Sequence, residues 1–104
     1  MYRMAFKMKL FPAQEAEYKR RNDQIWPELK SLLKEAGISD YSIFLDPETN
    51  TLIAILSVSD PGNLASLRQQ TIMQQWWDYM ANIMETNSDK SPVSIELKEM
   101  FYMP

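Results

Sequence analysis

Five aromatic and amide side chains offer the most distinct chemistry in this sequence. Tyr18 and Asn22 are four residues apart, so on a helix both project from one face. Trp76 and Trp77 are adjacent, and on a helix they point about 100° apart, so one packs inside while the other faces a pocket. Tyr41 lies among apolar neighbours and has a hydroxyl that needs a partner. Aromatic faces stack on the C–H surfaces of sugars, and indole N–H groups donate to hydroxyls, so these residues are typical of a pocket for a neutral polar ligand.

Each of these groups also has a plainer explanation. The polar stretch 18–23 is equally typical of a solvated helix surface. The two tryptophans suit a core combined with a dimer interface, and Tyr41 suits an ordinary core tyrosine. Carboxylates such as Glu28, Asp40 and Asp78 are scattered without the spacing of metal ligands, so no metal site is predicted.

The composition excludes several classes of function. The chain of 104 residues has no cysteine and no histidine, so it has no disulfide, no thiolate ligand and no imidazole acid or base. Any catalysis must use carboxylates, tyrosines, lysines or backbone dipoles. A net charge of −3 with scattered basic residues argues against a nucleic-acid partner. No stretch is long and apolar enough for a membrane span, and residues 1–10 do not resemble a signal peptide, so we expect a cytoplasmic protein.

The periodicity predicts strands and helices in alternation. Apolar residues at even positions of 2–10 predict a strand with one solvent-exposed face. Residues 38–46 and 51–58 predict two more strands joined by a turn. Because strand 51–58 has apolar residues on both faces, we expect it to be central and covered on both sides. A helix is expected from Pro12, broken near residues 25–26 and restarted at Pro27. Asp60 and Pro61 suggest the cap and first turn of a short helix, and Thr71 with Gln74 resembles a capping box for a helix reaching about residue 84. Residues 93–97 alternate again, with a bulge expected near 98–99.

This order predicts one α+β domain over residues 1–104, with a ferredoxin-like βαββαβ topology and an antiparallel sheet. Helices cover one face of such a sheet. The other face needs a ligand or a second sheet, which indicates a homodimer closed face to face.

Several long strings of the sequence resemble the L-rhamnose mutarotase family. They are YKRRNDQIWPEL at 18–29, Tyr41 with Asp46, QWWDYM at 75–80, and the ending SPVSIEL at 91–97 followed by FYMP at 101–104. The resemblance runs from Arg3 to Pro104 without evident gaps. It implies a dimeric α/β barrel of ferredoxin-like protomers, acting without metal or organic cofactor, that interconverts the α and β anomers of L-rhamnose.

The resemblance also implies roles for particular residues. Tyr18, Tyr41, Trp76 and Trp77 match the positions that contact the sugar. In the family pattern the residue after the two arginines is a histidine, assigned as the proton donor, whereas this chain has Asn22. An asparagine can hydrogen-bond a sugar, but it has no titratable proton and cannot be a general acid.

This departure leaves three explanations open. The chain is a variant made to trap sugar, a natural member that routes protons through Tyr18, Asp23 or water, or a relative that only binds or regulates. The fold type alone adds haem-degrading enzymes and cofactor-free monooxygenases, although a chain without histidine lacks the usual axial haem ligand.

Overall fold

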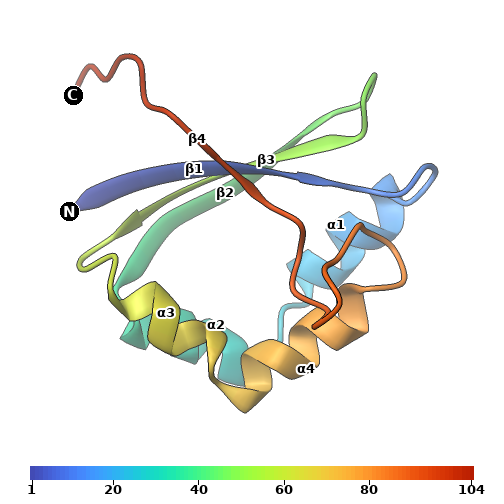
Figure 1. Ribbon diagram of the computed structural model, residues 1–104, viewed down its shortest axis with the longest axis horizontal. Helices are drawn as coiled ribbons and strands as arrows, with labels where there is room; N and C mark the ends of the chain where they lie inside the picture. The colour runs from blue at the N-terminus through green and yellow to red at the C-terminus, as the bar shows by residue number, and fades with distance from the viewer.

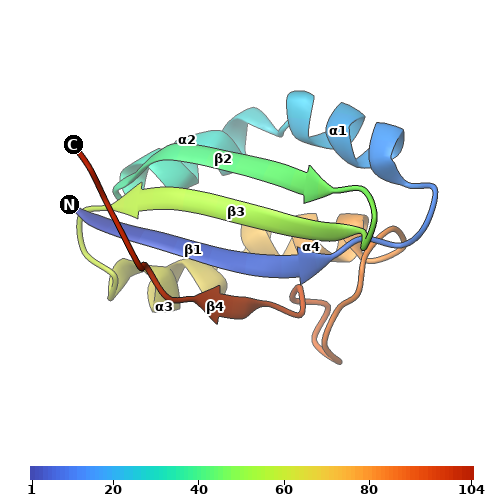
Figure 2. The same ribbon diagram turned by 90° about the horizontal axis from the view of Figure 1, so that it is seen from above.

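The computed structural model describes all residues, 1–104, as a four-stranded antiparallel sheet with helices on one face (Figure 1). The elements in chain order are β1 (Tyr2–Lys9), α1 (Glu15–Asp23), α2 (Pro27–Glu35), β2 (Ile38–Asp46), β3 (Thr51–Val58), α3 (Asn63–Arg68), α4 (Thr71–Met80) and β4 (Ile95–Leu97). The strand order is β2-β3-β1-β4, and Figure 2 shows the strands side by side above the helices. The predicted α+β class and ferredoxin-like arrangement are confirmed.

Strand β3 lies in the middle of the sheet and supplies much of the core. It pairs with β1 from Tyr2 opposite Val58 to Lys9 opposite Thr51, and with β2 on its other side. Its inward residues are at most 4% exposed: Leu52, Ala54, Leu56 and Val58. Its outward residues Ile53 and Ile55 are half-buried, and no helix of this chain covers them. The central position predicted for this strand is therefore confirmed, whereas the chain itself covers only one of its faces.

The break between α1 and α2 is where the sequence predicts it. Helix α1 ends at Asp23, and α2 begins at Pro27. Trp26 has an extended ψ of 131°, because a residue before proline is pushed out of the helical region. The start of α1 differs from the expectation: Ala13 has a φ of +65°, which no right-handed helix contains, so the helix begins at Glu15 and not near Pro12.

The second half of the chain corrects two predicted caps. Asp60 accepts a hydrogen bond from the Gly62 amide at 3.0 Å in a turn, and α3 begins only at Asn63. Thr71 and Gln74 form no capping box, because the Gln74 side chain donates to the Arg68 carbonyl at 3.2 Å. The Arg68 carbonyl lies within reach of the Gln74 side chain and competes for it, so the predicted capping box does not form.

The end of the chain is less regular than expected. Helix α4 stops at Met80. Met84 instead forms an isolated antiparallel β-bridge with Leu10, directly after β1, and both side chains are buried. Strand β4 has three residues, and no strand or bulge follows at 98–99. The tail crosses to the side of the sheet away from the helices (Figure 1), where Arg3 lies 3.3 Å from Glu99 and 4.0 Å above the ring of Tyr102. No helix has the length and apolar character needed to cross a membrane.

Candidate active site

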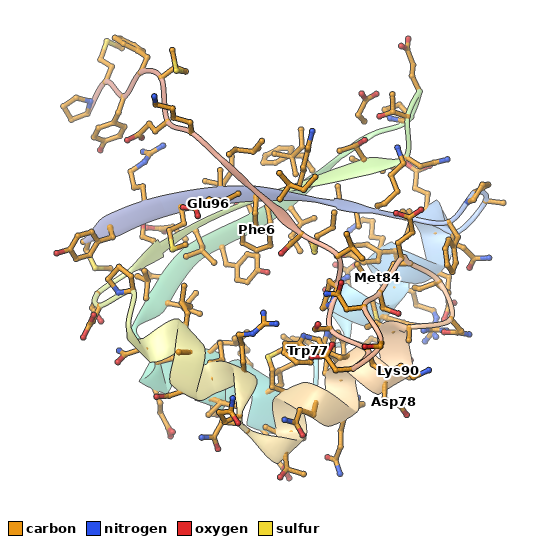
Figure 3. The ribbon with its side chains drawn as sticks, viewed as in Figure 1. Phe6, Trp77, Asp78, Met84, Lys90 and Glu96 are labelled. Atoms are coloured by element: carbon orange, nitrogen blue, oxygen red, sulfur yellow. The ribbon has the colours of Figure 1, made fainter.

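A cavity of about 1100 Å³ lies between the inner face of the sheet and the helices. All five residues singled out in the sequence line it: Tyr18, Asn22, Tyr41, Trp76 and Trp77. In Figure 3, Phe6 from β1 and Trp77 from α4 approach this space from its two opposite sides. The structure therefore brings together residues from α1, β2 and α4 that are far apart in the sequence.

Helix α1 presents Tyr18 and Asn22 on one face, as their spacing predicts. The Asn22 amide nitrogen donates to the Tyr18 backbone carbonyl at 2.9 Å, so the side chain is held against its own helix. Tyr18 is buried, and this burial raises the pKa of its hydroxyl to about 12, although the Asn22 side chain partly offsets the rise. The phenol is therefore a neutral hydrogen-bond donor over the physiological range of pH.

A bulge in β2 directs Tyr41 into the cavity. Ser39 pairs with Ser57 and Ser42 pairs with Ile55, so β2 has one extra residue between these pairs. Asp40 lies in the bulge with a φ of +50°, a left-handed conformation that Asp adopts more readily than most residues. Because side chains alternate between faces along a strand, the extra residue reverses the phase and places Tyr41 on the inner face.

Tyr41 lines the cavity and has a perturbed hydroxyl. The residue as a whole is 40% exposed. Desolvation of the hydroxyl, and then the nearby Tyr18 phenol, raise the pKa of Tyr41 well above its ordinary value. The two phenols are thus close enough to influence each other's ionisation.

The two tryptophans have different surroundings. Trp76 packs edge-on against Trp26 at 5.0 Å between ring centroids and against Tyr79 at 5.6 Å. Trp77 has the Arg68 guanidinium 5.2 Å from its ring. Both line the cavity while being less than 10% exposed, so the predicted division into one core and one pocket tryptophan is wrong, and each belongs to the core and the cavity wall together.

Arg21 joins the helix that carries Tyr18 to the helix that carries the tryptophans. Its guanidinium donates to Glu17 at 2.7 Å within α1, and to the Tyr79 carbonyl at 2.8 Å and Asn82 Oδ1 at 2.9 Å at the end of α4. It also lies 4.4 Å above the Tyr79 ring. The neighbouring Arg20 hydrogen-bonds only Glu17 and Gln24, although Glu17 and then the nearby Tyr79 raise its pKa. Arg21 therefore fixes the distance between two walls of the cavity.

Three cavity residues escaped the sequence reasoning. Arg68 and Glu96 line the cavity, as does the bulge residue Asp40. Arg68 carried no signal because it is a lone cation at the end of a short helix. Glu96 carried none either, because its alternation with Ile95 and Leu97 predicts the apolar pair, and not Glu96, on the inner face.

The chemistry of this cavity is that of oxygen-rich, uncharged ligands. No three acidic side chains lie close enough together to hold a metal ion. Phenol hydroxyls, the Asn22 amide, the Arg68 guanidinium and carboxylates such as Asp40 and Glu96 supply hydrogen-bonding groups, and indole faces supply stacking surfaces. The cavity can bind a polyol and move a proton between its oxygen atoms.

Comparison with known proteins identifies close relatives over the whole chain. The family model described as L-rhamnose mutarotase matches residues 3–103. The L-rhamnose mutarotase of Formosa agariphila is 57% identical over 103 residues, covering 99% of each chain. The L-rhamnose mutarotase of Bacteroides thetaiotaomicron is 55% identical over the same length and coverage.

Comparison with solved structures gives the same result as the sequence comparison. The crystal structure of an L-rhamnose mutarotase from Formosa agariphila superposes with a TM-score of 0.93 at 55% identity, covering 100% of both chains. A putative antibiotic biosynthesis monooxygenase from Bordetella bronchiseptica has a TM-score of 0.68 at 14% identity, covering 95% of this chain and 96% of its own. At that identity the second likeness shows a shared fold and nothing of function.

Proposed function

Because this chain belongs to the L-rhamnose mutarotase family, we propose that its cavity binds L-rhamnose and interconverts the α and β anomers. The observation that carries the proposal is that Tyr18, Asn22, Tyr41 and the two tryptophans line one cavity. Indole faces stack on the C–H surface of the pyranose, and the phenols and the amide hydrogen-bond its hydroxyls.

The reaction opens and recloses the pyranose ring. The anomeric hydroxyl loses its proton, the bond from C1 to the ring oxygen breaks, and the ring oxygen gains a proton. The open-chain aldehyde turns about the C1–C2 bond and recloses on its other face by the reverse transfers. Every bond that breaks is remade, so the anomers interconvert without any co-reactant.

In this chain Tyr18 donates the proton to the ring oxygen, and Asn22 holds the sugar. Asn22 is fixed by its bond to the Tyr18 carbonyl, and both side chains line the cavity from the same helix. A phenol with a pKa of about 12 is a weaker acid than an imidazolium, because a general acid is most effective when its pKa is near the working pH. We therefore expect a lower turnover rate than in a family member with histidine at this position. The loss is at most about 10²–10⁴-fold, which is the whole contribution that positioned proton transfer makes to a rate.

Saturation-transfer NMR of L-rhamnose tests the proposal directly. Exchange between the two anomeric proton signals accelerates in proportion to added protein. Tyr18→Phe removes the hydroxyl but keeps the ring, and it lowers exchange while leaving the thermal midpoint nearly unchanged. An exchange rate equal to that of the buffer, for L-rhamnose and for related pyranoses, rules out a mutarotase.

The presence of Asn22 in place of an acid supports a second function, that of a sugar-binding or regulatory relative without turnover. Calorimetry separates the two. Binding of L-rhamnose without accelerated exchange favours the second function, and the absence of binding by any monosaccharide excludes both.

The active form is a cytoplasmic homodimer with its two sheets face to face, with no nucleic-acid partner. Support comes from the outer side of the sheet, where Phe44 is 61% and Ile95 57% exposed beside the half-buried Ile53 and Ile55. Apolar patches of this kind are typical of interfaces. Light scattering gives the mass of two chains, and Phe44→Lys, which places a charge on this face, gives the mass of one. A monomeric wild-type protein contradicts the dimer.

A further inference from the structure

We propose that Glu96 is a catalytic residue of this site: its carboxylate takes the proton from the anomeric hydroxyl during ring opening and returns it on closure. This inference rests on the proposed mutarotase function. Ring opening needs a proton acceptor, and neither the Asn22 amide nor the neutral phenols supply a basic one. Among the side chains of the cavity, a carboxylate is the type that supplies one.

The pairing of β4 with β1 places Glu96 on the inner face of the sheet. Glu96 is opposite Phe6, and directly paired residues have their side chains on the same face. Phe6 lines the cavity from β1, and Figure 3 shows both residues at the sheet side of the space that Trp77 borders from α4. The neighbouring Ile95 and Leu97 therefore point to the outer face.

The Glu96 carboxylate is free to react. Glu96 takes part in none of the four ion pairs of the chain, whose acidic partners are Glu17 twice, Asp23 and Glu99. No side-chain hydrogen bond of the protein involves Glu96. An acceptor already held by a cation is a weaker base, so an unpaired carboxylate suits proton abstraction.

The other carboxylates of the cavity are less well placed. Asp23 is bound to Lys19 at 2.9 Å. Glu15, Asp40 and Glu96 are all exposed, but only Glu96 has a regular strand partner, Phe6, whose pairing fixes its side chain on the inner face. Glu15 begins α1, and Asp40 lies in the irregular bulge of β2. By contrast, β4 is separated from β2, which carries Tyr41, by three strand spacings, about 14 Å. That span accommodates a monosaccharide with hydrogen bonds of about 2.8 Å to groups on both sides.

The proton transfers balance over one turnover. The Glu96 carboxylate takes the anomeric proton while the ring oxygen, which keeps the electron pair of the broken bond, takes the proton of the Tyr18 hydroxyl. After the aldehyde turns, the protonated Glu96 returns its proton to the carbonyl oxygen. The sugar hydroxyl that re-forms the ring gives its proton back to Tyr18.

Glu96→Gln tests the proposal, because it keeps the size and removes the base. Glu28→Gln and Glu48→Gln are matched controls, since each makes the same change at an exposed carboxylate outside the cavity. We expect Glu96→Gln to lower the NMR exchange rate about 10²-fold or more, while calorimetry gives L-rhamnose affinity within about threefold of the wild type. Glu96→Asp, which retains a carboxylate one carbon shorter, recovers part of the rate.

Two results overturn the assignment, and they are distinguishable. If the wild-type protein accelerates exchange and Glu96→Gln retains that rate, the mutarotase function stands and Glu96 is not its base. If the wild-type protein accelerates no exchange, the proposed function fails and the role of Glu96 fails with it. Equal losses in Glu96→Gln and both control variants also contradict a specific role.

Discussion

Arg21 offers the sharpest test of how the two walls of the cavity are held together. Arg21→Met keeps a long apolar side chain and removes the guanidinium, which joins α1 to the end of α4 through the Tyr79 carbonyl and Asn82. Each of these two hydrogen bonds contributes about 1 kcal/mol net, and the guanidinium over the Tyr79 ring contributes about 0.5–1 kcal/mol. The variant is therefore less stable by about 2–3 kcal/mol, which lowers the thermal midpoint of a domain this size by about 10–20 °C.

The same change weakens catalysis, because Tyr18 and the two tryptophans lie on the helices that Arg21 joins. A displacement of about 1 Å between reacting groups reduces a rate by about 10²-fold, so we expect at least a tenfold lower exchange rate at a temperature where the variant is folded. Arg21→Lys keeps the charge but not the fork that reaches several acceptors, so it recovers only part of both losses.

Arg20→Met is the control for these measurements. Arg20 shares Glu17 with Arg21 but makes no hydrogen bond to α4. Differential scanning fluorimetry gives the midpoints, and saturation-transfer NMR gives the exchange rates. If Arg20→Met and Arg21→Met have the same midpoint and the same rate, the connection to α4 does not position the cavity walls.

Three further predictions follow from the site. Asn22→His raises the anomer exchange rate by about 10²-fold or more, because it restores a titratable group beside Tyr18; an unchanged rate in the NMR assay contradicts this. Asp40→Val destabilises the protein by about 1–2 kcal/mol and weakens calorimetric sugar binding, because a β-branched residue resists positive φ. Asp40→Gly retains both the stability and the sugar binding, because glycine tolerates positive φ. If Asp40→Val and Asp40→Gly have the same stability and affinity, the conformation of the bulge is not what supports them. Arg20 and then Arg21 hold the pKa of Glu17 at about 2 against an ordinary 4.5, so its stabilising contribution is present above about pH 4.5 and is lost as the pH falls toward 2. The thermal midpoint of the wild type therefore declines over that window more steeply than the midpoint of Glu17→Gln.

The sequence predicted those elements that local rules decide. Alternating side chains predicted β1 and β3, and Pro27 predicted the break between α1 and α2 to within two or three residues. The spacing of Tyr18 and Asn22 predicted their common face. These features depend on backbone geometry within a few residues, which sequence patterns report directly.

Features decided by distant contacts were not predicted. Gln74 matched a capping box but bonds the Arg68 carbonyl, and α4 ends early because Met84 pairs with Leu10. The left-handed conformation of Asp40 and the inward direction of Glu96 depend on the register between strands. Neither register nor a competing acceptor can be read from one segment alone.

The size of the cavity bears on the step in which the sugar is open. A volume of about 1100 Å³ is at the upper end of that of small-molecule pockets. A cavity fitted closely around a six-membered ring would hinder the aldehyde as it swings about the C1–C2 bond. The spare room lets the linear form turn over without leaving the protein, so several inversions of configuration can take place in a single residence.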